Sequence, residues 1–270
     1  MVDISKYLNN ETFLINDKST WHQNLLDLIE SNKSLIRNYN YIETYNSNLR
    51  EKAKKCTPVN YLDLHRTNPY YDDLGYVKEC VKSELQKLTI IGYHATRLTN
   101  EEIVKIKNGG LITSSKENCY ERADNLLLHG YISKNECDYI KSHCILNVPL
   151  EANRIGQIWF LAGSCDISTK DTGLNNLYKD YGGETIRNGI ENTPLLEKLN
   201  AISKPCSVIS YVQLNTVPYY LIDTLAEKLL LKSNKRDISK ISFELYSQSK
   251  TIPVIDIIYV NEHTKLKIKK

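Results

Sequence analysis

The sequence predicts an α+β fold with a helical N-terminal region, and two observations carry that prediction. Apolar residues recur at helical spacing in the first part of the chain, within a polar background. From Ile90 onwards, short apolar and β-branched runs alternate with amphipathic segments. Helices followed by short strands separated by helices are typical of α+β domains. We therefore expect a helical N-terminal extension over 1–70 and one main domain over 71–270.

The composition is that of an ordinary globular protein. The 270 residues are 41% hydrophobic and 25% charged, with a net charge of +3. That charge is too small to indicate nucleic-acid binding by itself, although it leaves room for a local basic patch. The seven cysteines form no CxxC pair, and there is no signal peptide or 18-residue apolar run. We expect a cytoplasmic protein with reduced thiols and no membrane association.

Two helices are expected before the main strands. An apolar stripe at helical spacing marks the first helix, which Ser19 or Thr20 could cap. Its members are Trp21, Leu25, Leu28 and Ile29. Thr57-Pro58 interrupts the polar segment that follows, because proline disfavours helix in the preceding residue. A second helix is expected over about 72–87, where apolar residues again recur at helical spacing.

The main domain is organised around the stretch 90–111, an apolar strand followed by a helix. The strand ends in Tyr93-His94-Ala95-Thr96-Arg97, and Thr99 is expected to cap the helix. A strand thus delivers an imidazole, a hydroxyl and a guanidinium to one strand–helix junction. A helical hairpin over 117–143 should follow, with Ser133 and Glu136 as a capping box. Further strands are expected over 155–162, 206–214 and 252–260, and a helix over 218–232.

The tetrapeptide Tyr93-His94-Ala95-Thr96, at the end of a strand and before a helix that ends in Gly-Gly-Leu, resembles the first motif of the ADP-ribosyltransferases. The similarity is to their His-Tyr-Glu branch, of the diphtheria-toxin and poly-ADP-ribose-polymerase type, where this strand commonly reads Tyr-His-Gly-Thr. The resemblance implies NAD as a substrate and a split β-sheet core, with the NAD cleft between two small sheets. It also implies that His94, Tyr93 and Thr96 hold the adenosine ribose and the nicotinamide amide. Arg97 offers a planar fork of donors to the pyrophosphate.

An aromatic strand is expected to form the second part of the NAD site. Residues 156–162 read GQIWFLA and stand where the family usually has Gly-x-Tyr-Phe-Ala, so Trp159 replaces the usual tyrosine. One of Trp159 and Phe160 should face the cleft while the other faces the core, since side chains alternate along a strand. An aromatic face there would stack on the nicotinamide ring, which is positively charged until its glycosidic bond breaks.

The third part of the site is a catalytic carboxylate. Transfer from NAD passes through an oxocarbenium-like state, which a glutamate bonded to the ribose 2′-hydroxyl would stabilise. Our first candidate is Glu184 in Tyr-Gly-Gly-Glu, which would act together with His94. Glu244 is the alternative, because the family's glutamate usually lies on a strand near the end of the fold.

The function predicted from this resemblance is NAD-dependent mono-ADP-ribosylation of a macromolecule, with nucleic acid favoured over protein as the acceptor. Lys105, Lys107, Lys116 and the C-terminal lysines could steer a polyanion towards the site. The expected setting is a cytoplasmic toxin of a toxin–antitoxin or anti-phage system, which would add an antitoxin protein as a partner.

Two other interpretations remain open. Cys165 follows a strand and could be the nucleophile of a hydrolase or acyltransferase, paired with His94 or His143. The chain could also be a non-enzymatic module that binds a partner. No metal site is expected, because the six histidines share no HxxxH or HExxH spacing. Four possible metal ligands could still meet across the helical hairpin: His129, Cys137, His143 and Cys144.

Overall fold

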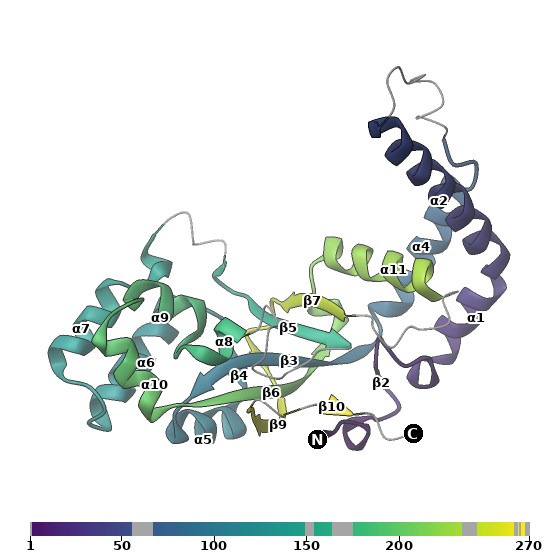
Figure 1. The fold of residues 1–270 in the computed structure, drawn as a ribbon. Coiled ribbons are helices and arrows are strands. Elements are labelled where there is room, and N and C mark those ends of the chain that lie inside the picture. Colours follow the sequence, from purple (N-terminus) through teal and green to yellow (C-terminus); the bar gives the residue numbers. More distant parts are fainter. Residues whose placement is uncertain are drawn as a thin grey trace.

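The computed structural model describes residues 2–55, 67–148, 154–163, 175–233, 242–261, 264 and 266–267. The fold is α+β, as the sequence predicts: a mostly antiparallel sheet lies between a projecting helical arm and a second group of helices (Figure 1). In the part of the chain that the structure describes, no helix combines the length and the hydropathy needed to cross a bilayer.

One principal sheet holds six strands, in the order β7-β5-β3-β6-β9 with β2 beside the start of β3. These strands are β2 (Thr12–Phe13), β3 (Thr89–Leu98), β5 (Ile158–Gly163), β6 (Lys204–Gln213), β7 (Ser242–Ser247) and β9 (Val254–Tyr259). Within this sheet, β2 and β3 form the only parallel pair among the described strands. Two short pairs lie apart from it: β1 (Val2–Asp3) with β10 (Leu266–Lys267), and β4 (Leu111–Ile112) with β8 (Thr251–Ile252). The described residues thus form one large sheet where two small ones were expected.

β3 is the central strand, and its two edges differ. It pairs with β6 along all ten of its residues, whereas its ladder with β5 consists of the single pair Tyr93–Leu161. Gly92 makes the close approach of β5 possible, because a Cβ atom there would lie 2.9 Å from the ring of Phe160 and 2.7 Å from Val212. Beyond Tyr93, the edge of β3 that faces β5 is therefore left without a ladder to that strand.

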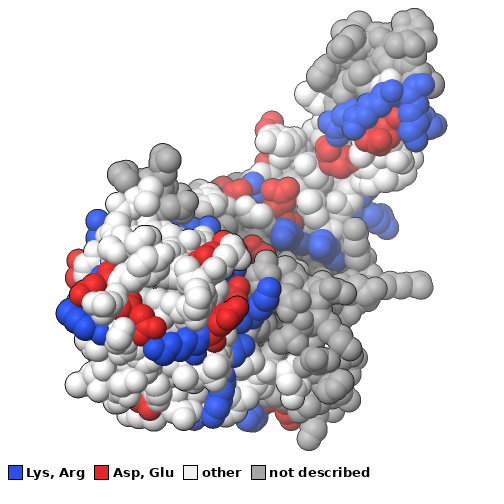
Figure 2. All heavy atoms as spheres, turned by 60° about the vertical axis from the view of Figure 1, so that its left-hand side comes forward, with Lys and Arg blue, Asp and Glu red and all other residues white. Residues whose placement is uncertain are grey.

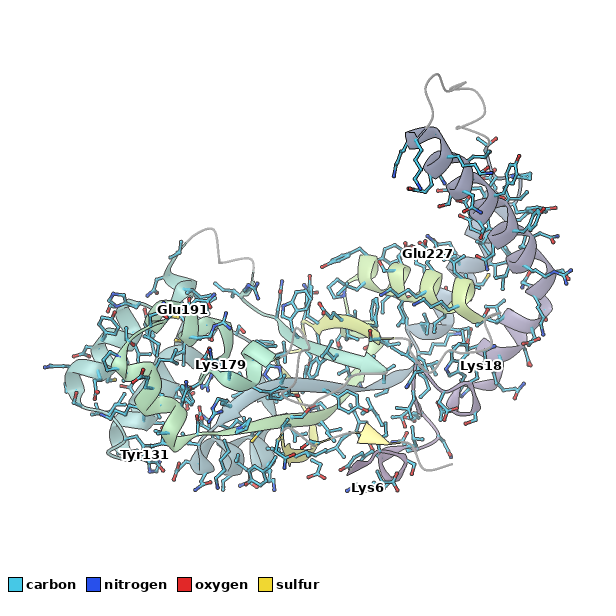
Figure 3. The ribbon with its side chains drawn as sticks, viewed as in Figure 1. Lys6, Lys18, Tyr131, Lys179, Glu191 and Glu227 are labelled. Carbon is cyan, nitrogen blue, oxygen red and sulfur yellow. The ribbon has the colours of Figure 1, made fainter. Side chains whose placement is uncertain are left out.

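The helical arm packs on one face of the sheet and shares its main hydrophobic core. It consists of α1 (Gln23–Ser31), α2 (Lys33–Lys55), α4 (Tyr71–Leu85) and α11 (Tyr219–Ser233). α2 projects beyond the others, and lysine and arginine side chains gather at the far end of the arm (Figure 2). Lys18, labelled in Figure 3, ties the chain before α1 to the arm by donating to the carbonyl of Ser233 at the end of α11.

A buried lysine joins two helices of the arm. The side chain of Lys82 on α4 is only 2% exposed and contacts Asp223 of α11 at 3.0 Å and Glu79 at 2.8 Å, together with the hydroxyl of Tyr219. Burial opposes the charge, but these three partners outweigh it and raise the pKa of Lys82 above its ordinary value. The ammonium is thus held charged between α4 and α11.

The second group of helices has its own core and covers the other end of the sheet. It consists of α6 (Lys116–Leu128), α7 (Lys134–Ser142), α9 (Gly183–Ile190) and α10 (Pro194–Ile202), joined to the sheet by α5 (Asn100–Gly109) and α8 (Asn175–Lys179). The expected hairpin is confirmed as α6 and α7, and the Ser133–Glu136 capping box is present. Short 3-10 helices complete the fold: Ser5–Tyr7, Lys18–Thr20, Ile145–Asn147 and Leu214–Thr216.

The N-terminal segment is less purely helical than expected. β1 and β2 both lie within 1–70, and β2 joins the principal sheet by pairing with β3. Phe13 and Trp21 belong to the same core as β3, and the indole of Trp21 donates to the carbonyl of Leu14 at 2.9 Å. A two-residue strand is too short to show a periodic pattern, so no sequence pattern indicates it. The division at residue 70 stays a prediction.

Two glycines in helices should respond in opposite ways to substitution by alanine. A Cβ atom at Gly189 in α9 would lie 1.8 Å from the carbonyl oxygen of His143, whereas nothing lies within 4 Å of one at Gly75 in α4. We expect Gly189→Ala to destabilise the protein by about 2 kcal/mol through overpacking. Gly75→Ala should stabilise it by about 0.5–1 kcal/mol through helix propensity. Urea unfolding of both variants measures the two effects, and equal midpoints would contradict this packing of α9.

Candidate functional site

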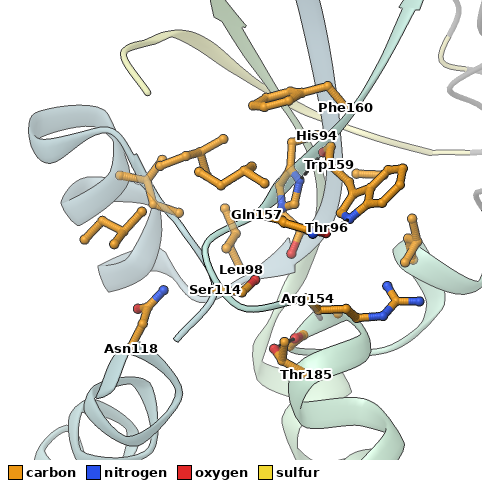
Figure 4. A pocket seen from close by; sticks show the side chains of 18 of the residues that line it. His94, Thr96, Leu98, Ser114, Asn118, Arg154, Gln157, Trp159, Phe160 and Thr185 are labelled. Carbon is orange, nitrogen blue, oxygen red and sulfur yellow. Dashed lines mark hydrogen bonds between the residues drawn. The ribbon is translucent and has the colours of Figure 1, made fainter. Parts of the chain in front are cut away.

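A cavity of about 750 Å³ opens beside the edge of β3 that has no ladder to β5 (Figure 4). Its walls come from β3, β5, β7, α5, α6, the segment 154–157 and the start of α9. The volume lies in the range of small-molecule and cofactor sites. Several residues predicted from separate parts of the sequence therefore share one cavity: His94, Thr96, Trp159, Phe160 and Glu244.

His94 lies on the wall of this cavity and is half-buried. Its Nδ1 is 2.9 Å from the carbonyl oxygen of Trp159, and its ring meets that of Phe160 edge-on at a centroid distance of 6.0 Å. A carbonyl oxygen can only accept, so Nδ1 must carry the proton. In the neutral ring, Nε2 is then an acceptor, suited to a hydroxyl or amide donor.

The neutral form of His94 is favoured. Burial lowers the pKa of its imidazole below the ordinary value of 6.5; the carbonyl of Trp159 opposes this shift, and the positive charge of Arg122 adds to it. The imidazole is therefore uncharged at neutral pH, and its tautomer is set by the backbone of β5.

The two aromatic residues of β5, Trp159 and Phe160, lie in different environments. Phe160 is 2% exposed and belongs to the main core, although it reaches the cavity wall. Trp159 is 41% exposed at the cavity, with its Nε1 donating to Oε1 of Gln157 at 3.1 Å and its ring 4.8 Å from that of Tyr246. Trp159 is thus the ring that a ligand in the cavity can reach.

The other residues of the β3 motif are divided between the two faces of the sheet. Thr96 is on the same face as His94 and lines the cavity. The ring of Tyr93 packs on the opposite face, in a core with Ile4 and Tyr7, although the residue borders the cavity. Side-chain alternation along the strand explains this division.

Arg97 does not line the cavity, contrary to the expectation that it meets a pyrophosphate there. Its guanidinium donates to the carbonyls of Tyr178 at 3.0 Å, of Asn200 at 2.7 Å and of Ser203 at 2.7 Å. Its Nε donates to the hydroxyl of Ser203 at 3.2 Å. Arg97 therefore joins β3 to α8 and α10, and its planar fork serves carbonyl oxygens of the chain itself.

The carboxylate of Glu102, in the first turn of α5, is the centre of a largely buried hydrogen-bond network. Glu102 Oε2 accepts from the backbone of Thr99 at 2.9 Å, completing a capping box. Its Oε1 accepts from Nε of Arg122 at 2.7 Å and from the hydroxyl of Tyr181 at 2.7 Å. These bonds hold α6 and the turn before α9 against the β3–α5 junction.

Both candidate carboxylates come from segments that reach this cavity. Glu244 on β7 lines it and is exposed to solvent. Glu184 lies in the first turn of α9, whose neighbouring residues Gly182, Gly183 and Thr185 also line the cavity; its side chain is outside the described residues. Gly182 has a φ of 84°, and a Cβ atom there would lie 2.5 Å from that of Ile186, so the turn requires glycine.

Arginines are the residues that sequence reasoning missed. Arg122, Arg154 and Arg187 line the cavity and come from three separate segments. Arg122 Nη2 is buried and has no hydrogen-bond partner among the described residues. An unpaired buried donor on a cavity wall is a group that a bound anion would satisfy. No spacing in the sequence links these three arginines, so only the fold brings them together.

The alternative sites find little in the described residues to support them. Cys165 lies outside the described residues, so the structure neither places it near a histidine nor separates it from one. His143 stacks on Tyr139 at a centroid distance of 4.0 Å, and its Nδ1 lies 3.0 Å from the carbonyl of Tyr139. Within the described part of the chain, no group of three or more His, Cys, Asp or Glu side chains is arranged to hold a metal ion.

The titration of His94 should be visible in protein stability. Because burial lowers its pKa in the folded state, the unfolded state binds this proton more readily below pH 6.5. Wild-type stability should therefore fall as the pH drops through the window below 6.5, and His94→Gln should fall less steeply. Urea unfolding of both proteins between neutral pH and about pH 5 measures this difference. Parallel curves would mean that the imidazole is not buried as described.

Comparisons of this chain with protein-family models, with curated proteins and with solved structures find no match. Only features of the chain itself therefore bear on its function. These are the motif on β3, the aromatic residues of β5, the arginines of the cavity and the two carboxylate-bearing segments.

Proposed function

We propose that the protein is an NAD-dependent mono-ADP-ribosyltransferase that modifies a macromolecule, with the cavity beside β3 as its NAD site. One observation carries the proposal. Three segments far apart in the sequence, which carry the predicted histidine, aromatic and carboxylate parts of the site, converge on one cavity: His94 on β3, Trp159 on β5 and the start of α9. A transferase-type core is part of the proposal, and the single residue pair between β3 and β5 is consistent with an opening at that position in the sheet.

The chemistry of the cavity suits the parts of NAD. Nε2 of His94 can accept a hydrogen bond from a ribose hydroxyl, and the hydroxyl of Thr96 lies on the same face of the strand. The exposed ring of Trp159 offers a face to the cationic nicotinamide. Arg122 and Arg154 replace Arg97 as our candidates for the pyrophosphate, since both line the cavity and the donors of Arg97 are engaged elsewhere.

The proposed reaction breaks the bond between C1′ of the ribose and the nicotinamide nitrogen. The bonding electrons leave with the nicotinamide, which becomes neutral, and C1′ acquires oxocarbenium character. A carboxylate near the ribose stabilises that developing charge. A nucleophilic atom of the acceptor then forms the new bond to C1′ and loses its proton to a base. Glu184 remains our first candidate for this carboxylate and Glu244 the second.

Nucleic acid is our favoured acceptor class and protein the alternative. The setting that we propose is a toxin of a toxin–antitoxin or anti-phage system, with an antitoxin protein as a possible partner. The rival proposal is a module that binds a partner without chemistry. The two differ in a simple observation, because only the transferase requires NAD to bind the cavity and to be consumed.

Transfer of label from NAD should depend on one of the two glutamates. We expect purified protein to label one of three separate pools, of RNA, DNA or cell protein, when it is given NAD carrying label on its adenylate. Glu184→Gln should reduce transfer about 10²- to 10³-fold, because the amide cannot stabilise the developing positive charge. Glu244→Gln should have a small effect.

If instead Glu244→Gln reduced transfer strongly and Glu184→Gln had only a small effect, Glu244 would be the catalytic carboxylate. His94→Ala removes the acceptor nitrogen from the cavity wall, and it too should strongly reduce transfer. Label in no pool, together with no thermal shift on adding NAD, would reject the transferase and leave the cysteine-dependent hydrolase and the binding module.

Binding of NAD should quench the fluorescence of Trp159. The chain has two tryptophans, and the other, Trp21, is buried in the core. We expect quenching in a Trp21→Phe background, because the nicotinamide ring stacks on the exposed indole. ADP-ribose lacks that ring and should quench much less, which makes it the matched control. Transfer activity with no quenching by NAD would move the stacking role away from Trp159.

A further inference from the structure

α2 is rich in positive charge, and its outward face contributes neither to the cavity nor to the hydrophobic core. α2 contains six basic residues and two acidic ones, a net charge of +4 (6 − 2), while the whole chain has +3 (35 − 32). The rest of the chain is therefore slightly acidic, and the excess positive charge is concentrated on this helix. Figure 2 shows the lysine and arginine side chains gathered at the end of the arm.

The cations of α2 fall into two sets. Lys33 pairs with Glu30 at 2.9 Å, Arg50 with Glu43 at 3.6 Å and Lys54 with Glu51 at 2.7 Å. The other three make no ion pair with any residue that the structure describes, and all three are exposed to solvent: Arg37, Lys52 and Lys55. Half of the positive charge on the helix is thus available to a partner.

The three available cations share one face of α2 with two exposed tyrosines. Tyr41 is 72% exposed and Tyr45 is 46% exposed, one helical turn apart. At 100° per residue, these five positions and the exposed Asn48 form a single stripe. The buried residues Ile36 and Asn46 lie on the opposite side, towards the rest of the arm. We call the face formed by Arg37, Tyr41, Tyr45, Asn48, Lys52 and Lys55 the outward stripe.

We propose that the outward stripe binds single-stranded nucleic acid. Cations along a surface track a phosphate backbone, and tyrosine rings between them provide faces on which unpaired bases stack. The stripe runs from Arg37 to Lys55 over about 27 Å of helix axis, which suits a strand of several nucleotides. Duplex nucleic acid fits less well, because its bases are already stacked and offer the tyrosines no free face.

Along the stripe, positively charged residues flank the two tyrosines on both sides. Arg37 lies one turn before Tyr41, and Lys52 and Lys55 lie beyond Tyr45, so charge brackets the aromatic pair on both sides. If these cations bind the phosphate backbone at both ends of the stripe, the bases between them lie over the two tyrosine rings. This site is separate from the cavity beside β3, and the inference does not depend on the proposed transferase activity.

Anisotropy of labelled oligonucleotides tests the inference with the full chain. The probes are RNA and DNA single strands of mixed sequence, about twelve nucleotides long, and the matching duplexes. We expect the wild type to bind a single strand, with RNA and DNA compared directly. Tyr41→Ala with Tyr45→Ala should weaken binding at least about tenfold. Arg37→Gln, Lys52→Gln and Lys55→Gln together should weaken it and lower the salt slope by about 2.

The matched control removes the same number of charges from the same helix. Lys33→Gln, Arg50→Gln and Lys54→Gln together should leave most of the affinity, because these cations are ion-paired and lie off the stripe. Circular dichroism verifies that each variant is folded.

Three results would overturn the inference. The first is that the wild type binds no single strand at low salt. The second is that the control variant loses as much affinity as the stripe variant, which would indicate unspecific attraction to positive charge. The third is binding of duplex and single strand with equal affinity and no loss in the tyrosine variant.

Discussion

The carboxylate of Glu102 is the contact on which the candidate site depends. One side chain accepts from the backbone of Thr99, from Arg122 and from Tyr181, so it joins three segments that are far apart in the sequence. These bonds help to fix the turn that carries Glu184 relative to His94. Three donors offset part of the cost of removing a carboxylate from water. The cavity is therefore built around a structural glutamate.

The elements with strong local signals were predictable. The strand that carries His94, the capped helix after it and the α6–α7 hairpin follow from apolar spacing and capping residues. Strands β1, β2 and β10 were not, because two residues are too few to show a period. Pairing partners are also invisible in a single sequence, so the single large sheet could not be anticipated.

The site was predictable where chemistry lies within one motif and unpredictable where it is assembled by the fold. His94 and Thr96 share a cavity because alternation along a strand puts them on one face. The same alternation sends Arg97 to the other face, where carbonyl oxygens satisfy its donors. Arg122, Arg154 and Arg187 come from three unrelated segments, and no local pattern marks them as a group. Long-range packing determines which of these residues meet at one site.

The single residue pair between β3 and β5 has a mechanical consequence. β5 and β7 are joined by six residue pairs, whereas the ladder between β5 and β3 is the single pair Tyr93–Leu161. The join between β3 and the β5–β7 ribbon therefore depends mainly on side chains: His94 Nδ1 lies 2.9 Å from the carbonyl oxygen of Trp159, and Phe160 packs over Gly92. A substitution at one of these residues can thus alter the wall of the cavity without removing a ladder pair.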